Sequence, residues 1–180
     1  MKNKKSLFSY LMNLPEVFTK ENNVNVVVET PQGSHIKYKY EEGNFKLHKY
    51  MSTGTCFPYD FGFLPHTKGG DGDPLDVLVL NDFPSAVGCI IECRLIGVLI
   101  AKQKEKGKKF NRNDRLIAIP VASHRYADIN SIQDLECTFL NDIVNFFTYY
   151  NVMQEREFKL LAVKGSDEAI KMIKDNLAAM

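Results

Sequence analysis

Three aspartates, Asp71, Asp73 and Asp76, fall within six residues and lead directly into the apolar run 77–80. Carboxylates held this close repel one another, so a fold keeps them where cations, protons or turn hydrogen bonds compensate their charge. A turn accounts for the first two aspartates but not for Asp76, which opens an apolar strand where an unpaired charge is costly. Because carboxylates without histidine or cysteine suit hard cations, the cluster predicts a Mg²⁺ site.

Other interpretations of the cluster fail on spacing. A calcium loop of the helix-loop-helix type needs glycine at its sixth and glutamate at its twelfth position, where this chain has Asp76 and Asp82. A phosphate-binding glycine loop needs a Lys-Ser/Thr pair, which does not follow the glycines of 69–72. The four histidines show no zinc spacing, and no Gly-x-Ser-x-Gly elbow occurs. Acids, lysines and tyrosines suit metal-assisted hydrolysis of a phosphoanhydride.

Three strand-forming segments and one aromatic segment must position these side chains. Residues 23–29 alternate and are rich in valine, which predicts a strand that ends in Glu29. Residues 35–40 and 45–50 alternate on either side of a Glu-Gly-Asn turn, which predicts a hairpin with a lysine-bearing face. Residues 57–63 predict an ordered aromatic loop that leads toward the acidic cluster.

The remaining segments are expected to be strands followed by helices. Strands are expected at 77–80, at 90–100 with a bulge or bend at Gly97, and at 116–121; helices are expected at 6–14, at 131–150 and after Gly165. Residues 102–115 hold seven basic and two acidic residues, which predicts a solvated hairpin tip suited to anion contact. This order predicts a mainly β fold with helices (α+β), as a small barrel or curled sheet with helices packed outside.

Composition is that of an ordinary globular protein. The 180 residues are 44% hydrophobic and 25% charged, which predicts a single domain over 1–180. With a net charge of +1, no global field favours nucleic acid or an anionic membrane, and neither is expected as a partner. The longest apolar tract, 95–101, is far too short to span a bilayer, and the cysteines form no CxxC pair. We therefore expect a cytoplasmic protein with reduced thiols.

The chain resembles the soluble family I inorganic pyrophosphatases, whose recurring pattern is Asp-x-Asp-Pro-x-Asp-Val. Residues 71–77 match that pattern throughout. The likeness continues in collinear order through residues 27–31, 36–38, 51–53, 58–67, 97–98, 117–120 and 146–150. The resemblance implies an OB-fold-like five-stranded β-barrel with flanking α-helices. It also implies hydrolysis of pyrophosphate to two orthophosphates with several Mg²⁺ ions, or Mn²⁺ or other divalent cations, in a homo-oligomer; bacterial members are commonly hexamers and eukaryotic ones dimers.

The resemblance also implies roles for individual residues by position. Asp71 and Asp76 would bind metal, and Glu29 would sit in the metal or metal-water shell. Asp73 would act as the base that activates the metal-bound water. The substrate-binding residues would be Lys37, Lys49, Arg115 and Tyr150. Without the resemblance, Glu29 and Lys37 are interpreted as strand-edge charges, and Tyr150 as the last core contact of its helix.

Several positions depart from the family's pattern. Most members carry arginine at Lys49 and lysine at Arg115, so both positions keep a positive charge. Lys39, Phe61 and Asn151 stand where most members have glutamate, tyrosine and lysine, so a hydroxyl and a cation are lost.

The loop before the strand that ends at Pro120 departs most. The family carries two further aspartates there, and here the loop is longer. Gap-free counting aligns the second aspartate with Asn113, but metal binding requires a carboxylate, so we expect Asp114 to be the ligand. For the first aspartate, Gln103 is the nearest position and Glu105 the nearest acid.

These departures leave two further hypotheses. One is a catalytically degenerate pyrophosphatase-like protein that binds phosphate or partners without turnover. The other is an OB-type oligonucleotide binder that uses residues 102–115 together with the aromatics. The near-neutral net charge argues against the latter.

Overall fold

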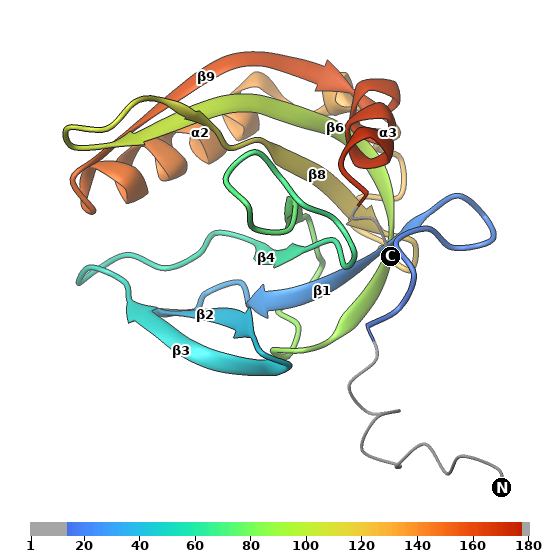
Figure 1. The fold of residues 1–180 in the computed structure, drawn as a ribbon. Coiled ribbons are helices and arrows are strands. Elements are labelled where there is room, and N and C mark those ends of the chain that lie inside the picture. The colour runs from blue at the N-terminus through green and yellow to red at the C-terminus, as the bar shows by residue number, and fades with distance from the viewer. Residues whose placement is uncertain (1–13, 178–180) are drawn as a thin grey trace, which may run out of the picture.

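The computed structural model describes residues 14–177, so the helix expected at 6–14 lies outside the described residues except for Leu14. In chain order the elements are β1 (Val24–Thr30), β2 (Ile36–Glu41), β3 (Asn44–Tyr50), β4 (Asp60–Phe63), β5 (Asp76–Val79), β6 (Ile90–Glu105), β7 (Asn111–Arg112), β8 (Arg115–Pro120), the 3-10 helix η1 (Ile132–Asp134), α2 (Cys137–Val152), β9 (Arg156–Gly165) and α3 (Ser166–Asp175). Figure 1 shows their arrangement.

Five strands form a closed ring of hydrogen-bonded pairs. β1 pairs with β4, β4 with β5, β5 with β8, β8 with β6, and β6 again with β1. Of these pairings β5–β8 is parallel and the others are antiparallel. β7 and β9 extend the sheet from β6, and the β2–β3 hairpin forms a separate two-stranded sheet (Figure 1). The expected mainly β, OB-fold-like architecture with helices is confirmed, although the ring is not a regular barrel.

The core consists of two apolar clusters on the two faces of the ring strands. β5 shows the division, because Leu78 packs into the cluster that includes Phe147 of α2, whereas Val77 and Val79 pack into the cluster that includes Ile173 of α3. Successive side chains of a strand point to opposite faces, so a strand covered on both faces is apolar throughout. The two helices thus explain the unbroken apolar run that follows the acidic cluster.

Two irregularities shape the ring. β1 and β4 pair Val28 with Gly62 and then Thr30 with Phe61, so Glu29 is the extra residue of a bulge. The bulge expected at Gly97 is confirmed, because the register of β6 against β8 shifts between Leu95 and Gly97. A bulge bends a strand and redirects a side chain. In β1 the redirected side chain is that of Glu29.

Three sequence-based expectations need correction. Residues 60–63 are the buried strand β4, and not part of an aromatic loop. The helix expected over 131–150 begins at Cys137, because Ser131 caps the single turn η1 and Leu135 is extended. β9 has no counterpart among the expected elements, although it pairs with β6 over most of its length. The last helix is confirmed, and it starts directly after Gly165.

Candidate active site

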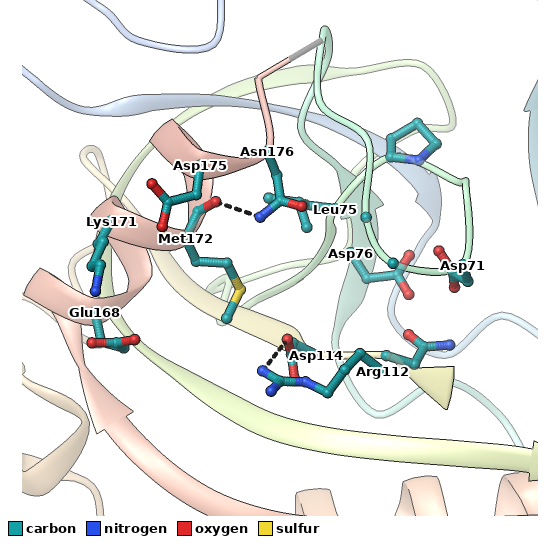
Figure 2. A pocket seen from close by; sticks show the side chains of 14 residues that line it. Asp71, Leu75, Asp76, Arg112, Asp114, Glu168, Lys171, Met172, Asp175 and Asn176 are labelled. Atoms are coloured by element: carbon teal, nitrogen blue, oxygen red, sulfur yellow. Dashed lines mark hydrogen bonds and ion pairs between the residues drawn. The ribbon is translucent and has the colours of Figure 1, made fainter. Parts of the chain in front are cut away.

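A cleft of about 160 Å³ brings together all the predicted site residues except Asp114. They are Glu29 from β1, Lys37 and Lys49 from the β2–β3 hairpin, Asp71, Asp73 and Asp76 from the acidic loop and β5, Arg115 from β8 and Tyr150 from α2. A second cavity of about 330 Å³ shares Asp71, Pro74, Asp76 and Asn113 with the cleft and has α3 as one wall (Figure 2). The smaller cleft is the candidate site, because it places acids opposite the lysines of the hairpin.

The basic wall of the cleft is built by the register of the hairpin. Lys37 lies directly opposite Lys49 across β2 and β3, an arrangement of like charges that normally destabilises a sheet. Aromatic rings offset part of this cost. The Lys37 Nζ lies 4.6 Å from the centroid of the Phe61 ring, and the Lys49 Nζ lies 4.9 Å from that of Tyr150. Two ammonium groups held together in a cleft form a site for an anion.

Tyr150 lies between these lysines and the core. Its burial would by itself raise the pKa of the phenol, but the ammonium groups of Lys37 and Lys49 outweigh that effect and lower the Tyr150 pKa. Burial lowers the pKa of Lys49 in turn. The excess of positive charge at this wall therefore favours a bound anion such as phosphate.

The acidic loop, residues 67–75, is closed at its base by hydrogen bonds of the buried Thr67. The Thr67 hydroxyl donates to the carbonyl of Leu64 at 2.7 Å and accepts from the Leu75 N–H at 2.9 Å, so it joins the two ends of the loop. Within the loop, the Gly69 N–H donates to the Asp73 carbonyl at 2.7 Å. This frame presents the three aspartates to the cleft. Sequence reasoning did not identify Thr67, and its place in the resembling segment 58–67 was the available signal.

The acids of the cleft carry charge that is incompletely compensated. Burial raises the pKa of Glu29, although its Oε1 accepts the Tyr40 N–H at 2.7 Å. Desolvation also raises the pKa of Asp71, and the carboxylates of Asp76 and Asp73 raise it further. Asp73 lies at the exposed rim, where the Lys39 Nζ approaches it to 3.4 Å. Carboxylates with raised pKa values in one cleft favour a bound cation.

Comparisons with known proteins agree with this geometry. A family model described as inorganic pyrophosphatase matches residues 26–180. The chain belongs to the inorganic pyrophosphatase family. It is 35% identical over 157 residues to the inorganic pyrophosphatase of Campylobacter jejuni, covering 84% of this chain and 88% of that protein. It is 37% identical over 158 residues to that of Sulfolobus acidocaldarius, covering 86% and 85%. The solved inorganic pyrophosphatase of Thermus thermophilus superposes with a TM-score of 0.82 at 28% identity, covering 93% of this chain and 96% of that one.

In this member of the inorganic pyrophosphatase family, Asn113 rather than Asp114 faces the cleft. The Asp114 carboxylate lies in the second cavity, where it accepts hydrogen bonds from the Ala101 N–H at 2.8 Å and from Arg112 Nη2 at 2.7 Å (Figure 2). Asn113 lines both the cleft and the second cavity, whereas Asp114 lines only the second cavity. Asp114 therefore shares the second cavity with Asp71 and Asp76 but does not line the cleft that holds the lysines, and its role as a metal ligand stays a prediction.

The position of the first of the family's two further aspartates is also occupied by an amide. Gln103 lines the cleft, whereas the carboxylate of Glu105 forms ion pairs with Lys108 and Arg156. This edge of the cleft therefore offers two amides where the resemblance implies two aspartates.

The donor set of the cleft still fits a hard divalent cation. Glu29, Asp71 and Asp76 supply carboxylate oxygens, Gln103 and Asn113 add amide oxygens, and all are ligands that Mg²⁺ accepts. Desolvation raises the pKa of both Glu29 and Asp71, and a bound cation would favour their charged forms. Within residues 14–177, no group of three or more His, Cys, Asp or Glu side chains is already gathered as a metal site.

The burial of Glu29 predicts a pH-dependent stability. Because its pKa is raised above the ordinary value of 4.5, the folded state binds the proton more tightly than the unfolded chain. The carboxyl therefore costs nothing below about pH 4.5, and stability is lost as pH rises through the raised pKa. We expect the free energy of unfolding of Glu29→Gln, measured by urea unfolding in EDTA, to exceed that of the wild type by an amount that grows as pH rises from about 4 to about 8. The exposed Glu21→Gln is the control, and equal behaviour of the two variants would contradict the prediction.

Proposed function

We propose that this chain is an Mg²⁺-dependent inorganic diphosphatase that hydrolyses pyrophosphate to two orthophosphates. The observation that carries the proposal is the single cleft in which three aspartates of the acidic loop lie opposite the paired lysines of β2 and β3. Membership of the inorganic pyrophosphatase family supports the same reaction.

The side chains of the cleft divide into phosphate ligands and acids. Lys37, Lys49 and Tyr150 bind and orient the phosphate groups and neutralise the charge that develops on them. Asp73, at the exposed rim of the cleft, accepts the proton of the attacking water. Asp71 and Asp76 would hold Mg²⁺.

Glu29 completes this arrangement in the shell around the metal. Bound Mg²⁺ would supply charge neutralisation at the phosphate oxygens and make water easier to deprotonate. The bulge in β1 directs the Glu29 carboxylate to that position, and the Tyr40 N–H holds it there. Mn²⁺, or another divalent cation that prefers oxygen ligands, would suit the same residues.

Phosphate release from pyrophosphate tests the proposal directly. With Mg²⁺ in excess we expect a turnover on the order of 10 per second, and no turnover in EDTA. A chain that binds methylene diphosphonate but releases no phosphate with Mg²⁺ or Mn²⁺ would instead be the catalytically degenerate protein. The two amides at Gln103 and Asn113 are the observation that favours this second candidate.

We further propose that residues 1–180 form one domain, which acts in the cytoplasm as a homo-oligomer without nucleic-acid or membrane partners. All four cysteines are free thiols, and the net charge is +1. Across residues 14–177 we find no helix with the length and apolar character needed to span a membrane. Sedimentation of the purified chain would determine its oligomeric state.

A further inference from the structure

We infer that Arg115 is a built-in cation of the cleft that holds Asp76 and competes with divalent metal for its carboxylate. The inference rests on the proposed function, since it concerns an acid proposed as a metal ligand. It assigns Arg115 a positioning role, in place of the substrate contact that the resemblance implies.

The pair is built into the sheet. Asp76 opens β5 and Arg115 opens β8, and these strands run parallel with Val77 opposite Leu116. The first residues of the two strands are therefore neighbours. The Arg115 Nη1 lies 2.8 Å from the Asp76 Oδ2, and the Arg115 side chain is only 6% exposed.

Further contacts fix the guanidinium in this position. Arg115 Nη1 also donates to the side-chain oxygen of Asn113 and, at 2.8 Å, to the main-chain carbonyl of Asp114. The amide at Asn113, which is the departure from the family's pattern, thus contacts the arginine as well as the cleft. Among the described residues, the buried Nε of Arg115 has no hydrogen-bond partner, and the ion pair with Asp76 is made through Nη1.

Aromatic rings complete the enclosure. The guanidinium carbon of Arg115 lies 5.2 Å from the centroid of Phe147 and 5.8 Å from that of Phe61. A guanidinium is planar and weakly hydrated, so it stacks on aromatic faces better than the strongly hydrated ammonium of lysine. Phe61 presents such a face without a hydroxyl. Arginine at 115 and phenylalanine at 61, both departures from the family's pattern, are therefore physically matched.

The fixed charge has a consequence for metal binding. An arginine stays protonated in proteins, and an ion pair that is partly shielded from water is stronger than one at the open surface. A divalent cation that binds Asp76 must share or displace this partner, whereas Asp71 has no such contact at comparable distance among residues 14–177. We expect the first metal to bind more weakly than the number of carboxylates suggests.

Metal binding without substrate tests the inference. Mn²⁺ is titrated into the metal-free full-length chain by calorimetry, for the wild type, Arg115→Met and Lys49→Met. Both variants remove one positive charge from the same cleft, but Lys49 does not contact Asp76. We expect Arg115→Met to bind Mn²⁺ about tenfold more tightly than the wild type, and Lys49→Met to change the affinity less than about threefold.

The outcomes separate the alternatives. An equal gain in both variants would show a general field effect and overturn the pairing, as would an unchanged affinity in a folded Arg115→Met. If Arg115→Met does not fold without metal, Arg115→Lys is measured in its place. Its Mn²⁺ affinity should be about threefold higher than that of the wild type, because a hydrated ammonium holds Asp76 less firmly. An unchanged Mn²⁺ affinity in Arg115→Lys would overturn the inference. Pyrophosphate hydrolysis by the wild type is measured separately, so its absence refutes the proposed function and not the Arg115 pairing.

Discussion

Asp73→Asn should lower kcat for Mg²⁺-dependent pyrophosphate hydrolysis by about 10² to 10⁴-fold, the usual contribution of a general base. Asparagine keeps the size of the side chain but cannot accept a proton from water. Asp73 is exposed, and its ion pair is with Lys39 at 3.4 Å, so the fold loses at most a surface interaction worth about 1 kcal/mol or less. The variant should therefore unfold at nearly the same urea concentration as the wild type.

A matched aspartate provides the control for this experiment. Asp128 is exposed and lies outside the residues that line the cleft, so Asp128→Asn should retain wild-type kinetics. Steady-state phosphate release measures kcat and KM separately, and KM should change little because Lys37, Lys49 and Tyr150 remain. An Asp73→Asn enzyme with more than about a tenth of wild-type kcat would remove Asp73 from the role of base.

The acidic wall and the basic wall could both be predicted because each depends on local patterns. Three aspartates before an apolar run already predict carboxylates at the mouth of a strand. The alternation of Lys37 and Lys39 predicts a lysine-bearing face of the hairpin, and a register shift between Lys37 and Tyr38 places Lys49 opposite Lys37. Local periodicity thus predicts the lysine-bearing face of β2, but it does not predict the register shift that brings Lys49 to Lys37.

The edge formed by β6, β7 and β8 could not be predicted in the same way. Here the choice between Asn113 and Asp114 depends on which face a short extended segment turns to the cleft, and shifting the register by one residue reverses it. Chemical preference for a carboxylate selected Asp114, but the Arg112 guanidinium and the Ala101 N–H hold that side chain in the second cavity. The side on which Asp114 lies is therefore decided by its contact with β6 and not by its neighbours in the sequence.

In the region of η1, α2 and β9, sequence periodicity predicted the helix but neither its first residue nor the strand after it. The spacing of apolar residues from 131 onward fits a helix, and α2 indeed supplies Phe147 and Tyr150 from that stretch. Its start was misplaced because Ser131 caps a single turn and not the helix itself. β9 was missed because its side chains alternate incompletely, with Phe158 as its one buried residue. Pairing with the long strand β6 stabilises it instead.

The position of Glu29 links the stability of the ring to the site. Residue 62 makes the bulge possible, because β1 passes so close to β4 that only glycine fits. The chain therefore uses a contact between backbones to direct a buried carboxylate into the cleft. A substitution at 62 should alter stability and catalysis together.

Gly62→Ala should destabilise the fold by about 3 kcal/mol or more, since overpacking against a backbone cannot relax by a change of rotamer. The added Cβ would lie 2.2 Å from the Val27 carbonyl oxygen and 2.9 Å from its carbon, so β1 must move away from β4. Urea unfolding in EDTA measures the loss, and Gly165→Ala, whose Cβ would meet nothing within 4 Å, is the control. Because the movement shifts Glu29, kcat/KM of the folded fraction should fall as well. A Gly62→Ala chain as stable as Gly165→Ala would show that the close approach of the two strands does not constrain the ring.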